Sequence, residues 1–143
     1  MEVNANEIIK KLWLGNKYAA SDKHFLISNS ITNIINVSDH IDNYFINEKQ
    51  YNYMRVPINN DLDSISILKD SLPKIIQFIN TAIDNNQSIL VHCKKGHRRS
   101  ALIVAYYIMK KYNCSFEMAK IKIRSKRTNT LKEPLVLKEA LLC

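Results

Sequence analysis

The feature that most restricts the fold of this chain is a short stretch in which an apolar segment, a polar loop and a second apolar segment follow one another directly. Ser88–His92 (SILVH) is typical of a buried strand, and Ser100–Met109 (SALIVAYYIM) is typical of a buried helix. The loop between them, Cys93–Arg99 (CKKGHRR), is rich in cationic side chains. A strand that passes through a tight loop into a helix N-terminus forms a pocket for an anion, because free N–H groups and the helix dipole both favour negative charge there. The stretch therefore predicts an α/β fold with an anion site.

The loop also carries a potential nucleophile. Cysteine reacts as its thiolate, which is stabilised at helix N-termini beside cationic groups, and Cys93 has both influences available. Arg99 supplies a planar guanidinium that matches two phosphoryl oxygens, a geometry that lysine does not offer. Gly96 is one of only two glycines in the chain and permits the positive φ that a loop curled around an anion requires. The backbone N–H groups of residues 94–99 are therefore expected to surround a phosphoryl group.

A cysteine after an apolar strand is most often an inert buried thiol, and a Cys-x5-Arg spacing alone is weak evidence for a catalytic loop. The pattern becomes specific because His92, Gly96 and Ser100 accompany it in a strand, loop and helix setting. This combination favours a catalytic role for Cys93 over a structural one.

The stretch His92–Ser100 reads His-Cys-x-x-Gly-x-x-Arg-Ser and resembles the signature of the cysteine-dependent protein phosphatases. The chain is similar to the small dual-specificity class within the protein tyrosine phosphatase superfamily. The resemblance implies a central, mostly parallel sheet flanked by helices, and a single catalytic domain over residues 1–143. The other segments that match the class are Leu12–Asn16, Ala19–Ala20, Ile31–Ser38, Tyr53–Ile58, Ser100–Ala101 and Ala105–Tyr106.

The resemblance implies hydrolysis of phosphotyrosine, phosphoserine and phosphothreonine in proteins, with no metal or other cofactor. Cys93 attacks phosphorus, an aspartic acid protonates the departing oxygen, and water then hydrolyses the phosphocysteine. Ser100 is expected to donate a hydrogen bond to the sulfur, and His92 is expected to order the loop. The expected phosphate-binding residues are Lys94, Lys95, Gly96, His97, Arg98 and Arg99.

The general acid is expected within Pro57–Asp63, where the family carries its aspartate. Asp61 is the first candidate because its distance from Cys93 along the chain suits the family pattern. Counting forward from the proline places Asn60 at the acid position instead, and Asp63 is the reserve choice. Asn and Asp also form turns commonly, so the segment alone leaves these alternatives open.

Charge leaves the substrate class open. The chain has a formal net charge of +8 and a basic reactive loop, so a polyanionic ligand such as a phosphoinositide or an RNA 5′ phosphate is an alternative to a phosphoprotein. RNA-directed relatives commonly continue with Arg-Thr-Gly, whereas this chain has Arg99-Ser100-Ala101, which favours the protein-phosphatase branch. A catalytically weak phospho-binding module is a third hypothesis, because the acid is not settled.

The rest of the chain alternates between strand-like and helix-like segments. Strands are expected at Leu12–Leu14, Ile34–Val37, Tyr53–Val56 and Ile89–His92, and helices near Ala19–Ser28, Ile67–Asn85, Ser100–Tyr112, Ser115–Arg127 and Glu133–Leu142. Pro73 either begins a new helix or kinks a continuous one. A second basic cluster is interpreted as a solvated helix face; it consists of Lys120, Lys122, Arg124, Lys126 and Arg127.

The sequence contains neither an apolar run of about 18 residues nor a signal peptide. Its three cysteines lack metal-ligand spacing, and their odd number argues against a disulfide scaffold; a reducing compartment would also keep Cys93 active. We therefore expect an intracellular, cytoplasmic phosphatase. The Lys-, Ile- and Asn-rich composition suggests an AT-rich genome, and large DNA viruses also encode small phosphatases of this class, in which case the compartment is the host cytoplasm.

Overall fold

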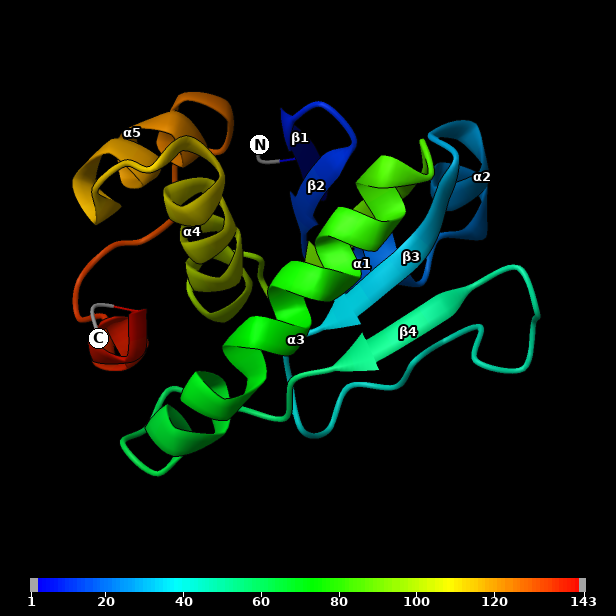
Figure 1. Cartoon of the computed structure of the whole chain (residues 1–143). Coiled ribbons are helices and arrows are strands. Elements are labelled where there is room, and N and C mark those ends of the chain that lie inside the picture. The colour runs from blue at the N-terminus through cyan, green and yellow to red at the C-terminus, as the bar shows by residue number, and fades with distance from the viewer. Residues whose placement is uncertain (1–2, 142–143) are drawn as a thin grey trace.

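A five-stranded sheet forms the centre of the computed structural model, which describes residues 3–141 (Figure 1). The strand order is β1-β2-β5-β3-β4. Strand β1 pairs with β2 antiparallel, and the other neighbouring strands are parallel, which confirms the expected mostly parallel sheet. The strands are β1 Ala5–Ile9, β2 Leu12–Gly15, β3 Ile31–Asn36, β4 Asn52–Arg55 and β5 Ser88–His92.

Helices cover both faces of this sheet. The α-helices are α1 Lys17–Ala20, α2 Lys23–Ser28, α3 Ser64–Asp84, α4 Arg99–Tyr112 and α5 Phe116–Lys126, and a 3-10 helix, η1, spans Val136–Leu141. The central strand β5 shows how the faces divide, because Ile89 and Val91 pack with α3, α4, α5 and η1 while Leu90 packs with α1 and α2. Every residue of β5 is buried as a result, as is typical of a strand covered on both sides.

Helix α3 is continuous, which decides between the alternatives for Pro73. The proline lies inside the helix, and the buried apolar positions continue on both sides of it. These positions recur every three or four residues and form one face of the helix; they are Leu68, Leu72, Ile75, Ile79 and Ala82. Packing of this face therefore holds the helix together across the proline.

Three expectations about the elements differ from the structure. Strand β1 was not predicted. The helix expected at Ala19–Ser28 is two short helices, because Asn16 caps α1 and Asp22 caps α2 with side-chain oxygens that accept backbone N–H groups. In the segment where a helix was expected at Glu133–Leu142, residues Val136–Leu141 form the 3-10 helix η1 rather than an α-helix, and residue 142 lies outside the described residues.

The sheet places the reactive loop at its carboxyl edge. Strand β5 ends at His92, which pairs in register with Gly15 of β2 and Asn36 of β3. The loop that follows therefore lies where three parallel strands end together, the usual ligand-binding edge of an open α/β sheet. Across residues 3–141, no helix combines the length and the apolar character needed to span a membrane.

Candidate active site

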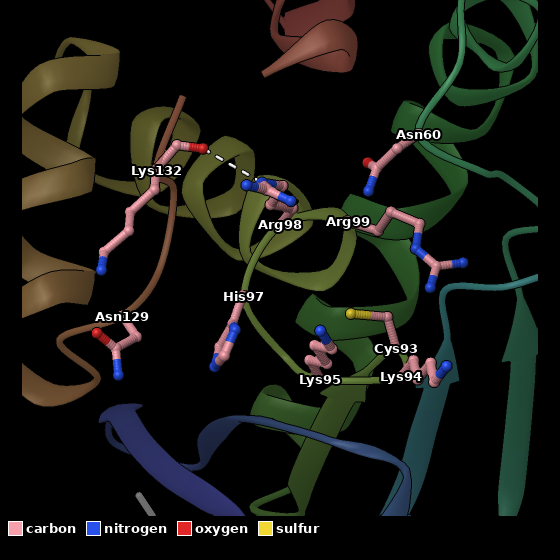
Figure 2. Close-up of a pocket in the computed structure, with 9 residues that line it drawn as sticks. All are labelled: Asn60, Cys93, Lys94, Lys95, His97, Arg98, Arg99, Asn129 and Lys132. Atoms are coloured by element: carbon pink, nitrogen blue, oxygen red, sulfur yellow. Dashed lines mark hydrogen bonds between the residues drawn. The ribbon is translucent and has the colours of Figure 1, made fainter. Parts of the chain in front are cut away.

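Cys93 lies directly after β5 and lines a pocket of about 530 Å³ (Figure 2). Its side chain is 3% exposed. The sulfur accepts a hydrogen bond from the N–H of Gly96 at 3.3 Å and lies 3.0 Å from the hydroxyl oxygen of Ser100. The sulfur therefore has two polar partners from the loop and the first turn of α4, and it is not enclosed by apolar side chains alone.

Gly96 has the backbone conformation that a side chain would disfavour, with φ of +73°. A Cβ built on it would lie 2.5 Å from the carbonyl oxygen of Gly15 and 3.0 Å from Nη2 of Arg127. The loop thus packs directly on the backbone at the end of β2. Glycine is required here both by φ and by this close approach.

Arg99 begins α4 and is partly exposed at the pocket. Its Nη1 donates a hydrogen bond to the carbonyl oxygen of Ile58 at 3.3 Å. Ile58 belongs to the segment in which the acid was expected, and Asn60 from the same segment also lines the pocket (Figure 2). Arg99 therefore connects the start of α4 to this segment while its guanidinium remains available at the pocket.

The structure places Asn60, and neither Asp61 nor Asp63, among the residues that line the pocket. Asp61 is exposed, and its Oδ1 accepts a hydrogen bond from the N–H of Ser64 at 3.0 Å, at the start of α3. Asp63 is also exposed and precedes α3 without a side-chain capping bond. Both aspartates follow the pocket-lining Asn60 within three residues of the sequence, and the role of Asp61 as general acid stays a prediction.

A third carboxylate lies near this segment. Asp39, just beyond the end of β3, accepts hydrogen bonds from His40 at 2.9 Å and from Asn59 at 2.8 Å. These bonds hold the pKa of Asp39 below its usual value, so its carboxyl group is ionised at neutral pH. The described residues that line the pocket do not include Asp39, whose carboxylate is held by these two side chains instead.

His92 is buried at the end of β5, and burial lowers its pKa from 6.5 to about 4. The ring is therefore neutral at pH 7. Its Nδ1 lies 3.3 Å from the carbonyl oxygen of Cys93, a geometry in which the Nδ1–H donates. Within residues 3–141, Nε2 of His92 has no hydrogen-bond partner. A neutral ring bonded to the loop backbone fits the ordering role that we expected for His92.

Two residues of the pocket wall were missed by the sequence analysis. Asn129 and Lys132 line the pocket from the connection between α5 and η1. Arg98 reaches the same connection, because its Nε donates to the carbonyl oxygen of Lys132 at 3.3 Å (Figure 2). No local pattern marks these residues, since the fold alone brings this connection beside the loop.

Arg127 corrects the interpretation of the second basic cluster as a solvated face. Its neighbours Arg124 and Lys126 are exposed, but Arg127 is 1% exposed. Its guanidinium donates hydrogen bonds to the carbonyl oxygens of Lys95 and Gly96, both at 3.0 Å. Arg127 follows Ile123 by four residues and so continues the buried face of α5, which consists of Phe116, Ala119 and Ile123; its charge, and not its position, suggested a solvated face.

Comparison with known proteins gives consistent matches over most of the chain. A family model described as "Dual specificity phosphatase, catalytic domain" matches residues 12–141. Human protein phosphatase Slingshot homolog 3 is 35% identical over 115 residues, which is 80% of this chain and 17% of that protein. The curated relatives are thus much longer, and the chain spans only part of each.

Solved structures share the fold. Human DUSP28 has a TM-score of 0.85 at 22% identity, over 99% of this chain and 92% of that one. A mouse protein assigned to the dual specificity phosphatases and complexed with zinc tungstate has a TM-score of 0.86 at 25% identity, over 96% of this chain and 84% of that one.

Proposed function

The chain belongs to the family of dual specificity phosphatase catalytic domains, and from this we propose that it hydrolyses phosphotyrosine and phosphoserine or phosphothreonine in proteins through a phosphocysteine intermediate. One observation carries the proposal: the sulfur of Cys93 lines an open pocket and has the Gly96 N–H and the Ser100 hydroxyl as polar partners. This is the environment that a reactive thiolate requires.

In the first step the thiolate of Cys93 forms a bond to phosphorus, and the bond from phosphorus to the leaving oxygen breaks. The leaving oxygen takes a proton from the general acid, for which we propose Asp61 with Asp63 in reserve. Asp61 lies in an exposed segment next to a pocket-lining residue, so its carboxyl group reaches the substrate once it releases the N–H of Ser64. Arg99 and the loop N–H groups stabilise the charge on the equatorial oxygens.

In the second step water attacks phosphorus, and the bond from sulfur to phosphorus breaks. The same carboxylate accepts a proton from the water, and the electron pair of the broken bond returns to the sulfur. Ser100 donates a hydrogen bond to the departing thiolate, because its hydroxyl oxygen lies 3.0 Å from the sulfur. Inorganic phosphate then leaves, and the enzyme is restored.

Charge at the pocket supports a strongly acidic substrate. The described residues that line the pocket include no carboxylate, while four of them, Lys94, Lys95, Arg98 and Lys132, are exposed cations. We propose that the phosphorylated segment carries further acidic groups near the phosphoryl group, and that its attraction to this surface weakens as salt is added. The name of the human Slingshot relative, a protein phosphatase, supports a protein substrate over a phosphoinositide or an RNA end.

Two further expectations remain part of the proposal. We propose that residues 1–143 act as a single catalytic domain, because one sheet and its two helix layers account for the described residues. A reducing intracellular compartment, such as the cytoplasm, keeps the thiol of Cys93 active.

The test is a comparison of four substrates under identical conditions: a phosphotyrosine peptide, a phosphothreonine peptide, a phosphoinositide and triphosphate-ended RNA. We expect phosphate release from both peptides and competition by tungstate, an oxyanion of phosphate-like shape. Faster release from the lipid or the RNA would overturn the choice of substrate class. If the chain binds the peptides but releases no phosphate, even from an activated aryl phosphate, the phosphatase proposal fails and the chain is a phospho-binding module.

A further inference from the structure

Four consecutive carbonyl groups of the reactive loop accept hydrogen bonds from outside the loop. The N–H of Lys17 donates to Lys94 O at 3.1 Å, Nη2 of Arg127 to Lys95 O at 3.0 Å, Nε of Arg127 to Gly96 O at 3.0 Å, and the N–H of Leu131 to His97 O at 2.8 Å. One side chain, Arg127, thus holds the middle two.

The peptide unit between Lys95 and Gly96 connects this support to the nucleophile. Its carbonyl oxygen accepts from Arg127 at 3.0 Å, and its N–H donates to the sulfur of Cys93 at 3.3 Å. Because a trans peptide unit is planar and its C=O and N–H point in opposite directions, fixing the oxygen toward Arg127 fixes the N–H toward the sulfur. Arg127 therefore acts on Cys93 through a single rigid peptide unit.

Arg127 is itself firmly placed. It is 1% exposed, and its Nη1 donates to Val3 O at 2.8 Å and to Asn6 Oδ1 at 2.9 Å. A buried guanidinium is costly unless its N–H groups are paired, so these contacts and the loop carbonyls stabilise each other. The N-terminal segment and the loop are thereby joined through one side chain. Lysine has no planar fork and cannot reproduce two parallel bonds to neighbouring carbonyls.

We propose that Arg127 is a positioning residue for the reaction: its guanidinium orients the two central peptide units of the loop so that their N–H groups face the sulfur and the phosphoryl group bound there. The inference rests on the proposed phosphatase activity for its kinetic consequence. Arg127 does not touch the substrate, and its effect passes through the Lys95–Gly96 and Gly96–His97 peptide units.

The test uses Arg127→Met, which keeps the length of the side chain and removes its donors, and Arg127→Lys, which keeps the charge. Arg124→Met is the matched control, because Arg124 lies in the last turn of α5, three residues before Arg127, is exposed, and donates from Nε to Thr128 O at 3.4 Å. The full chain of each variant is assayed with aryl phosphates that have good and poor leaving groups. Tungstate affinity is measured separately in the Cys93→Ser background.

We expect Arg127→Met to lower kcat/KM on the order of 100-fold, as a misplaced site does. The loss is equal for good and poor leaving groups, because the loop acts on the phosphoryl group and not on the departing oxygen. Tungstate affinity falls by about tenfold or more, Arg127→Lys is intermediate, and Arg124→Met stays within about twofold of the parent.

The proposal is overturned if Arg127→Met has a native near-ultraviolet circular dichroism spectrum and a kcat/KM within about threefold of Arg124→Met. If Arg127→Met does not fold, Arg127→Lys decides: unchanged kcat/KM and unchanged tungstate affinity overturn the proposal, and a loss of both supports it. If the parent chain hydrolyses no phosphate ester, the proposed function fails, and the tungstate comparison still tests the positioning role.

Discussion

The hydroxyl oxygen of Ser100 lies 3.0 Å from the sulfur of Cys93, and both side chains are buried. Ser100 is the second residue of α4, so the contact joins the proposed nucleophile after β5 to the helix that begins at the other end of the loop. A hydroxyl in this position stabilises a thiolate more than it stabilises a sulfur bonded to phosphorus. Its largest effect is therefore expected when the thiolate departs.

Replacing Ser100 by Ala should slow hydrolysis of the phosphocysteine more than its formation. A hydrogen bond to a charged group contributes about 1.5–3 kcal/mol, which corresponds to about 10- to 150-fold in rate. Rapid-quench measurement with an activated aryl phosphate should show an initial burst of phenol followed by a slow steady state. A variant with a normal steady-state rate would show that the hydroxyl serves only the start of α4.

Replacing Cys93 by Ser should abolish turnover while substrate binding remains, because the loop N–H groups and Arg99 are unchanged. A serine hydroxyl is not ionised at neutral pH and does not attack phosphorus at a measurable rate. Phosphate release and phosphopeptide affinity should be measured on the same preparation. Normal turnover by this variant would refute the covalent mechanism.

Replacing Asp61 by Asn should slow the hydrolysis of poor leaving groups most, by about 100- to 10,000-fold, because they depend on a proton donor. Asparagine retains an Oδ1 that can accept the Ser64 N–H, so the start of α3 should be preserved. The rate is measured across aryl phosphates of increasing phenol pKa. Unchanged rates would move the acid role to Asp63.

A companion variant uses the position of Asn60, which lines the pocket. Adding Asn60→Asp to Asp61→Asn places a carboxyl group in the pocket wall and should restore part of the rate with poor leaving groups. The same addition should not help an activated aryl phosphate. No gain with any leaving group would mean that a carboxyl at this position does not reach the departing oxygen.

The stability of the protein should fall between pH 6.5 and pH 4 because of His92. Burial lowers the pKa of His92 from 6.5 to about 4, so the unfolded chain binds a proton at this site in a range where the native protein does not. Stability from this group is therefore complete above about pH 6.5 and is lost as the pH falls, with a slope of up to about 1.4 kcal/mol per pH unit. The total is on the order of 3 kcal/mol at pH 4.

Urea unfolding at several pH values between 7.5 and 4 measures this effect. His92→Gln should be less stable at neutral pH and should show a shallower loss toward acid pH than the parent. His24→Gln is the control, because His24 is exposed on α2. If the free energy of unfolding falls with pH at the same slope in His92→Gln and in the parent, the loss of stability is not due to His92.

The sequence predicted the helices and strands that have a continuous or regularly spaced set of apolar residues. Strand β5 and helix α4 have continuous apolar residues, and α3 has a regular apolar face, so their places follow from local pattern. Strand β1 was missed because Asn6 and Glu7 interrupt its apolar residues. Its strand conformation comes from backbone pairing with β2 at the edge of the sheet, which no local pattern reveals.

The site was predictable where its residues are neighbours in sequence and not where the fold assembles them. The loop from Cys93 to Arg99 is one continuous segment, so its position between strand and helix could be predicted. Arg127 reaches the loop from the end of α5, and Lys132 lines the pocket from the connection that follows. The sequence analysis assigned Arg127 to a solvated helix face and gave Lys132 no role. Burial of a charge depends on partners from several segments, which composition and periodicity do not contain.

The contact between Gly96 and Gly15 bears on how the proposed active site is assembled during folding. These are the only glycines of the chain, and each lies where an added Cβ would meet an atom within 3 Å. Because the loop packs on the backbone at the end of β2, we expect the Gly96 N–H and the other loop groups to reach their places around Cys93 only after β2 has formed. Under the proposed function, hydrolysis of a chromogenic phosphate ester is therefore expected to begin only when β2 and the loop are in place, and a colorimetric assay should follow the last step of refolding in real time.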